Sequence, residues 1–214
     1  MRALVVSLLL LICSGCASIE EIIQPAAPDP RSLMPALEQR IAILIADERS
    51  RLAPNARSLA IDPELSDIAR HRAADMASKN YFAHMAPNGD TSASLLMAED
   101  AHFQGLLGEN MAAQHYSPGT GIDVEAFARR FVATWLGSAP HKENLSFPDY
   151  NRTGVGAAVN GDTVYVTQLF STDLGLGPHK DASPPAVVTP LPNAKAAMPD
   201  PTPPSLLRGS ERTP

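Results

Sequence analysis

The chain has 214 residues, a formal net charge of −6 and only two cysteines. This length suits one domain with flanking segments, because a core of ordinary size takes roughly 100–200 residues. The acidic balance argues against a nucleic-acid-binding protein, which needs a basic face to neutralise phosphates. Both cysteines, Cys13 and Cys16, lie near the N-terminus, so the remaining residues can form no disulfide among themselves and no thiolate zinc site.

The N-terminus has the form of a secretory signal peptide. A positive charge at Arg2 precedes an apolar run over residues 3–12, which is shorter than the roughly 20 residues of a membrane span. The following Ser14-Gly15-Cys16 resembles a bacterial lipobox, in which the cysteine is lipidated and becomes the first residue. Because Cys13 stands where leucine is usual, an ordinary signal peptide is the alternative. We predict a signal peptide over residues 1–15 and lipidation of Cys16.

Two proline-rich segments flank the part of the chain that is able to fold. Residues 16–32 are predicted to be a tether between the anchor and the domain. Residues 176–214 hold ten of the twenty prolines and few large apolar residues. Such a segment cannot bury enough surface to offset its ordering entropy, so we predict a disordered tail. The folded domain is therefore expected over residues 33–175.

Two helices are predicted in the first half of this domain. Ser32 precedes an apolar pattern of helical period that runs to about Leu52. Asp62-Pro63-Glu64 is a strong helix start, because the aspartate accepts backbone N–H bonds and proline fits the first turn. This second helix is expected to end near Lys79-Asn80.

The second half is predicted to contain two further helices and three strands. One helix begins at Asp123, with its aromatic residues on one buried face, and a short helix begins at Ser138. Strands are expected over residues 107–113, 154–159 and 163–171, the last two joined by a hairpin turn at Asn160-Gly161. Helices combined with a few antiparallel strands predict a layered α+β domain.

A series of short motifs connects the chain to a known family. In chain order, these motifs occupy residues 47–49, 59–65, 69–76, 81–84, 108–110, 135–145, 154–156 and 165–170. Their order and spacing resemble the secreted bacterial branch of the CAP superfamily, also called the SCP domain, over nearly all of residues 36–171. The resemblance implies an α-β-α sandwich, with a small antiparallel sheet between helices and a polar cleft over the sheet.

The chain departs from the animal and plant members of that family. Ser138 stands where those members carry a second glutamate, and the strand motif that supplies their second histidine is absent. A cluster of two histidines and two glutamates therefore cannot be carried over. The resemblance supplies only His84, Glu109 and His141 as candidate site residues.

Each of these three residues lies at the end of a predicted element, where side chains converge on clefts. Two imidazoles and a carboxylate suit a divalent metal such as zinc, so His84, Glu109 and His141 are candidate metal ligands. They suit general acid–base catalysis equally well, because histidine titrates near neutrality. The third alternative is a structural cluster, in which both histidines bond to Glu109. All three remain candidate catalytic and ligand-binding residues.

Other polar residues receive structural interpretations. Asn110 and Asn144 are expected to bond loop backbone, and His71 is expected to be a solvated helix position. Ser138 is interpreted as the cap of the short helix. The sequence contains no nucleophile elbow, phosphate loop or His-Glu-x-x-His helix, which argues against a serine hydrolase and a thermolysin-like protease.

The sequence thus predicts an extracytoplasmic CAP-domain protein that is anchored in the cell envelope through a lipid on Cys16. Ala17 after the cysteine favours the outer membrane, and a periplasmic or secreted protein is the alternative. Without a complete catalytic set, the cleft is expected to bind a small apolar or envelope-derived ligand. The alternative is a metal-assisted, peptidase-like hydrolase of peptide or envelope polymer, with His84 and His141 as ligands and Glu109 as ligand or base. A third hypothesis is a structural envelope protein whose tail contacts other components.

Overall fold

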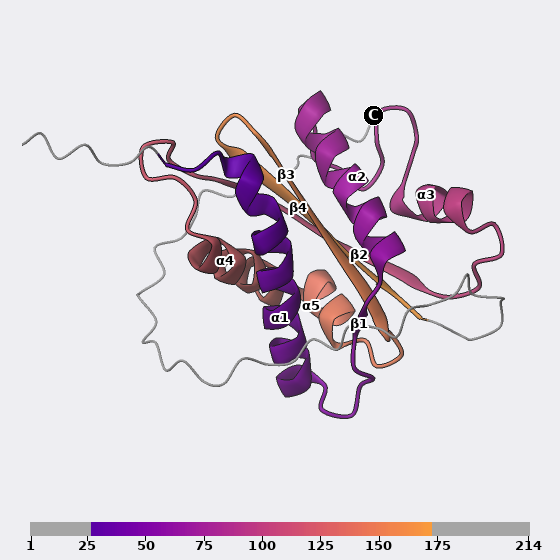
Figure 1. The fold of residues 1–214 in the computed structure, drawn as a ribbon. Coiled ribbons are helices and arrows are strands. Elements are labelled where there is room, and N and C mark those ends of the chain that lie inside the picture. Colours follow the sequence, from indigo (N-terminus) through magenta and orange to yellow (C-terminus); the bar gives the residue numbers. More distant parts are fainter. Residues whose placement is uncertain (1–26, 173–214) are drawn as a thin grey trace, which may run out of the picture.

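The computed structural model describes residues 27–172. They form three layers, in which a four-stranded sheet lies between two layers of helices (Figure 1). One face of the sheet is covered by α1 (Met34–Leu52), α4 (Val124–Leu136) and α5 (Ala139–Ser146). The other face is covered by α2 (Pro63–Lys79) and α3 (Ser92–Glu99). The α-β-α sandwich predicted from the sequence is confirmed.

The sheet has the strand order β1-β3-β4-β2. The strand β4 (Thr163–Ser171) pairs antiparallel with both of its neighbours, β2 (Leu107–His115) and β3 (Arg152–Asn160). The short β1 (Ala60–Ile61), which was not predicted, pairs in parallel with β3, so the sheet is mixed rather than purely antiparallel. β2 is an edge strand, and its successive side chains point to opposite helical layers.

The predicted helix starts agree with the structure where a side chain caps the helix. Asp62 accepts bonds from the first turn of α2, and Asp123 does the same for α4. Ser32, in contrast, caps nothing. It lies in a 3-10 turn, η1 (Pro30–Leu33), which is capped by Asp29 and which occupies the end of the predicted tether. Ser138 holds the cap position of α5, but its hydroxyl makes no capping bond.

The main core lies between α1, α4 and the sheet. Phe127, Phe131 and Trp135 repeat along one side of α4 and are each at most 3% exposed, with neighbouring ring centroids 6.3–6.4 Å apart. This confirms the prediction that the aromatic residues of this helix form a core stripe and not a ligand site. The core holds α4, and through it α5, against the sheet.

On the opposite face, α2 lies directly against β3 with no side chains between the two backbones. A Cβ atom added to Gly154 would lie 2.3 Å from the carbonyl carbon of Leu65. One added to Gly156 would lie 2.0 Å from the backbone nitrogen of Arg70. These glycines are therefore required by the close approach of the helix, and they set the depth at which α2 sits.

The predictions for the two ends of the chain are not tested by this structure. The signal peptide, the lipidated Cys16 and the tail over residues 176–214 lie outside the described residues. Between residues 27 and 172, no helix is both long and apolar enough to cross a membrane.

The close approach of α2 to β3 makes Gly156 intolerant of a side chain. We expect Gly156→Ala to lower the free energy of unfolding by about 1–3 kcal/mol, because the added methyl group forces the helix backbone away from the strand. Gly119→Ala is the matched control, since a Cβ atom there meets only the Ser117 hydroxyl at 4.0 Å. Urea unfolding measures both changes, and equal effects of the two variants would contradict this account.

Candidate functional site

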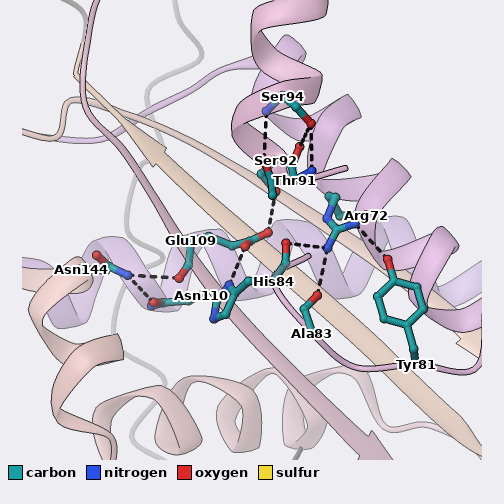
Figure 2. A network of polar contacts seen from close by, with 10 residues as sticks. All are labelled: Arg72, Tyr81, Ala83, His84, Thr91, Ser92, Ser94, Glu109, Asn110 and Asn144. Carbon is teal, nitrogen blue, oxygen red and sulfur yellow. Dashed lines mark hydrogen bonds and ion pairs between the residues drawn. The ribbon is translucent and has the colours of Figure 1, made fainter. Parts of the chain in front are cut away.

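Glu109 is held by two side chains, one at each carboxylate oxygen (Figure 2). Its Oε2 atom lies 2.6 Å from Nδ1 of His84, and its Oε1 atom accepts a bond of 2.5 Å from the hydroxyl of Ser92. The carboxylate is largely buried, with 12% of the side chain exposed, whereas 63% of the His84 side chain is exposed. Since His84 bonds through Nδ1, its Nε2 atom is left for other partners.

The segment that carries His84 is folded back onto the end of α2. The helix ends at Asn80, which adopts the left-handed conformation with φ of 52° and turns the chain. The guanidinium of Arg72 then donates bonds of 2.9 and 3.0 Å to the carbonyl oxygens of Ala83 and His84. These bonds place the backbone of His84 beside β2 (Figure 2).

Ser92 belongs to the site but was missed in the sequence analysis, together with the helix it begins. The first turn of α3 is set by a capping box, in which Thr91 and Ser94 each bond the backbone of the other. The spacing of Thr91 and Ser94 was the available signal, because a polar pair three residues apart is typical of helix starts.

His141 reaches the site from the other side of the sheet. Its backbone carbonyl accepts a 3.1 Å bond from the amide of Asn110, which points away from Glu109 because neighbouring residues of β2 alternate. No hydrogen bond joins its ring to His84 or Glu109, and its buried Nδ1 atom has no partner among residues 27–172. The structural alternative with both histidines bonded to Glu109 is therefore wrong for His141.

Two amide side chains connect α5 to β2. Asn144 donates to the backbone carbonyl of Glu109 at 3.1 Å and to the side chain of Asn110 at 2.9 Å (Figure 2). Asn110 and Asn144 were predicted to bond loop backbone; both bond backbone carbonyls, but these belong to α5 and β2 and not to loops. These bonds position α5, and with it His141, relative to the carboxylate.

The two histidines have opposite electrostatic environments. The hydrogen bond to Glu109 raises the pKa of His84 above its usual value, against smaller opposing effects of burial and of the Arg72 charge. Burial lowers the pKa of His141, and the charge of His84 lowers it further. The charge of His84 thus acts on the ring of His141, although no hydrogen bond joins the two.

The residues of this site, as placed, do not make a metal centre. Within the described part of the chain, no group of three or more His, Cys, Asp or Glu side chains is arranged to hold a metal ion. Each oxygen of Glu109 already accepts a hydrogen bond, so a metal there would share these oxygens with His84 and Ser92. The zinc site considered in the sequence analysis does not fit this arrangement.

A cavity of about 530 Å³ lies elsewhere on the domain. It is lined by Arg57, Gln104, Gly105, Leu106, Asp149 and Thr172, and by none of the three predicted site residues. The cleft expected over the sheet at His84 is therefore not this cavity.

The opposite environments of the two histidines predict different responses to Glu109→Gln. We expect the pKa of His84 to fall, because its largest raising influence is removed. The pKa of His141 should not fall, because it is set by burial and by the charge of His84, which decreases in the variant. NMR titration of the ring signals measures both, with the exposed His71 as the internal reference. A fall at His141 equal to that at His84 would contradict the described geometry.

Comparisons with known proteins agree with this architecture. Residues 45–170 match the CAP family, described as the cysteine-rich secretory protein family. The uncharacterized protein YkwD of Bacillus subtilis is 28% identical over 130 residues, which are 61% of this chain and 46% of that protein. The chain thus spans about half the length of this curated relative.

Two solved structures are also similar. An extracellular protein containing an SCP domain from Bacillus anthracis is 32% identical, with a TM-score of 0.54 over 70% of this chain and 45% of that one. An outer surface protein of Borrelia burgdorferi is 25% identical, with a TM-score of 0.53 over 64% of this chain and 92% of that one. With the family match covering more than half of its residues, the chain belongs to the CAP, or SCP-domain, family of bacterial type.

Proposed function

We propose that this CAP domain binds a small envelope-derived ligand at the site formed by His84, Glu109 and His141. The observation that carries the proposal is the ordered but exposed ring of His84. Its Nδ1 atom is fixed by a buried carboxylate, and its Nε2 atom is left for a ligand. A polar group fixed in advance at the surface loses little entropy when it binds, which favours recognition.

The state of Glu109 supports binding rather than hydrolysis. A carboxylate that acts as general base must lie within hydrogen-bond reach of the proton that it takes from the substrate. The Glu109 side chain is largely buried, and each of its oxygens already accepts a hydrogen bond, from His84 or from Ser92. The carboxylate therefore serves to orient His84, and the ligand is expected to meet the imidazole.

An extracytoplasmic location supports an envelope origin for the ligand. The similar protein of Bacillus anthracis is described as extracellular and that of Borrelia burgdorferi as an outer surface protein. The proposed lipid on Cys16 would hold the domain at the outer membrane. A periplasmic or secreted protein would meet the same class of ligand.

The ligand site is tested on the protein purified from its own envelope in mild detergent. We expect native mass spectrometry to detect one bound small molecule, apolar or envelope-derived, on the wild type. His84→Ala should reduce the bound fraction by about tenfold or more, because a hydrogen bond to a charged group contributes about 1.5–3 kcal/mol. His71→Ala, which alters an exposed position on α2, is the control and should keep the ligand.

Titration with defined probes makes the same test quantitative. Muramyl dipeptide represents fragments of the cell-wall polymer, and dihexanoyl phosphatidylglycerol represents envelope lipids. We expect one of the two to shift the ring signals of His84 with saturation. The proposal fails if neither probe binds and if the molecule on the purified protein is unaffected by His84→Ala.

The second candidate function is the metal-assisted, peptidase-like hydrolase. One observation favours it: a carboxylate bonded to Nδ1 orients an imidazole in the way that many metal-binding histidines are oriented. The bonded oxygens of Glu109 argue against it, as does the ring of His141, which bonds neither Glu109 nor His84. If zinc raises the melting temperature of the wild type but not of His84→Ala or His141→Ala, the hydrolase becomes the preferred function.

The anchor has its own prediction. We expect the mature protein to begin at Cys16 and to carry lipid, which mass spectrometry of the intact protein and of its first peptide will detect. Cys16→Ser should release the protein from the membrane fraction, because the acyl chains contribute about 0.8 kcal/mol per buried CH₂. Cys13→Ser is the matched control. A mature N-terminus at any other residue would refute the lipid anchor.

A further inference from the structure

A buried arginine without a carboxylate partner lies behind the site. Arg72 is 1% exposed, and no ion pair joins it to an acidic residue in the described part of the chain. Its terminal nitrogens bond only neutral groups, and its buried Nε atom has no hydrogen-bond partner among residues 27–172. Burial removes the hydration of this cation, and the opposite charge of Asp75 acts on it only across the Tyr81 hydroxyl, without a direct bond.

This arrangement is poorly explained by stability alone. Buried charged groups are often replaced by apolar residues of similar volume with no loss of stability. The neighbours of Arg72 on the same side of α2, Ala69, Ala73 and Met76, are fully buried and apolar. A methionine at position 72 would continue this apolar face, so the arginine is expected to serve another purpose.

The bonds that Arg72 makes indicate what that purpose is. Its Nη2 atom donates to two consecutive carbonyl oxygens, those of Ala83 and His84, and its Nη1 atom donates to the hydroxyl of Tyr81. All three partners lie in the segment that follows Asn80, so one rigid guanidinium holds the chain from Tyr81 to His84 (Figure 2). A planar fork of fixed geometry suits this task better than a flexible ammonium.

We propose that Arg72 is a positioning residue, which holds the backbone of His84 at the distance where Nδ1 meets the carboxylate of Glu109. It bonds neither the carboxylate nor the imidazole, and it positions His84 through the two carbonyl oxygens. The proposal deepens the proposed function of the same site and rests on it for its purpose. The geometry itself is tested without any ligand, so the two can fail separately.

Tyr81 provides the matched control for this proposal. Its hydroxyl accepts from Arg72 and donates to Asp75, which also forms an ion pair with Lys79 at 2.6 Å. Tyr81→Phe removes this outer branch of the network. It leaves intact the bonds from Arg72 to the carbonyl oxygens of Ala83 and His84.

The experiment measures how strongly Glu109 changes the pKa of His84 in three proteins: the wild type, Arg72→Met and Tyr81→Phe. In each, the pKa of His84 is determined by NMR with and without Glu109→Gln, and the difference is the coupling between the two residues. The charge of Arg72 also affects His84, but it cancels in this difference because it is present in both members of a pair. We expect Arg72→Met to reduce the coupling by at least about half, and Tyr81→Phe to leave it nearly unchanged.

Two results would overturn the proposal. One is an equal coupling in the wild-type and Arg72→Met backgrounds, which would mean that His84 reaches Glu109 without the bonds from Arg72. The other is an equal loss in Tyr81→Phe, which would mean that any disturbance of the network loosens the segment. If circular dichroism shows that Arg72→Met is unfolded, Arg72→Lys replaces it. A single ammonium cannot hold the same set of acceptors, so the coupling should again fall, and an unchanged value refutes the role of the fork.

Discussion

The contact between the backbones of α2 and β3 is the constraint on which the site depends. Gly154 and Gly156 leave no side chain between strand and helix, so the helix has a single depth at which it can sit. That depth determines where Arg72 projects and where the helix ends at Asn80. A displacement of α2 away from the sheet would move the segment of His84 with it and separate the imidazole from Glu109.

The position of Glu109 on an edge strand explains why the site draws on both layers of the sandwich. Residues of β2 alternate between the two faces, so the side chain of Glu109 meets His84 and α3 while that of the adjacent Asn110 meets α5. His84 and His141 consequently approach the same strand from opposite sides. A central strand would keep them apart, because its neighbours would separate the two faces.

The hydrogen bonds of the carboxylate decide which chemistry is favoured. A carboxylate that is free on one side could serve a metal or a proton transfer, whereas Glu109 is bonded on both. Its remaining influence is electrostatic, since it raises the pKa of His84 while burial lowers that of His141. Two rings of the same kind thus have pKa values that are shifted in opposite directions.

The amino-acid sequence by itself determined the elements whose signals are local. Asp62 and Asp123 start helices because their side chains accept bonds from the next turn. The hairpin predicted at Asn160-Gly161 forms one residue later, with the loop at Gly161-Asp162, because Asn160 pairs with Thr163 and only Gly161 has a positive φ. The order of the motifs was sufficient to indicate the family. Only the tertiary structure decided the bonding of the site. Ser92 meets Glu109, Arg72 reaches the segment of His84, and His141 stays apart because helices on two faces meet one edge strand, a relation between segments that no local pattern encodes.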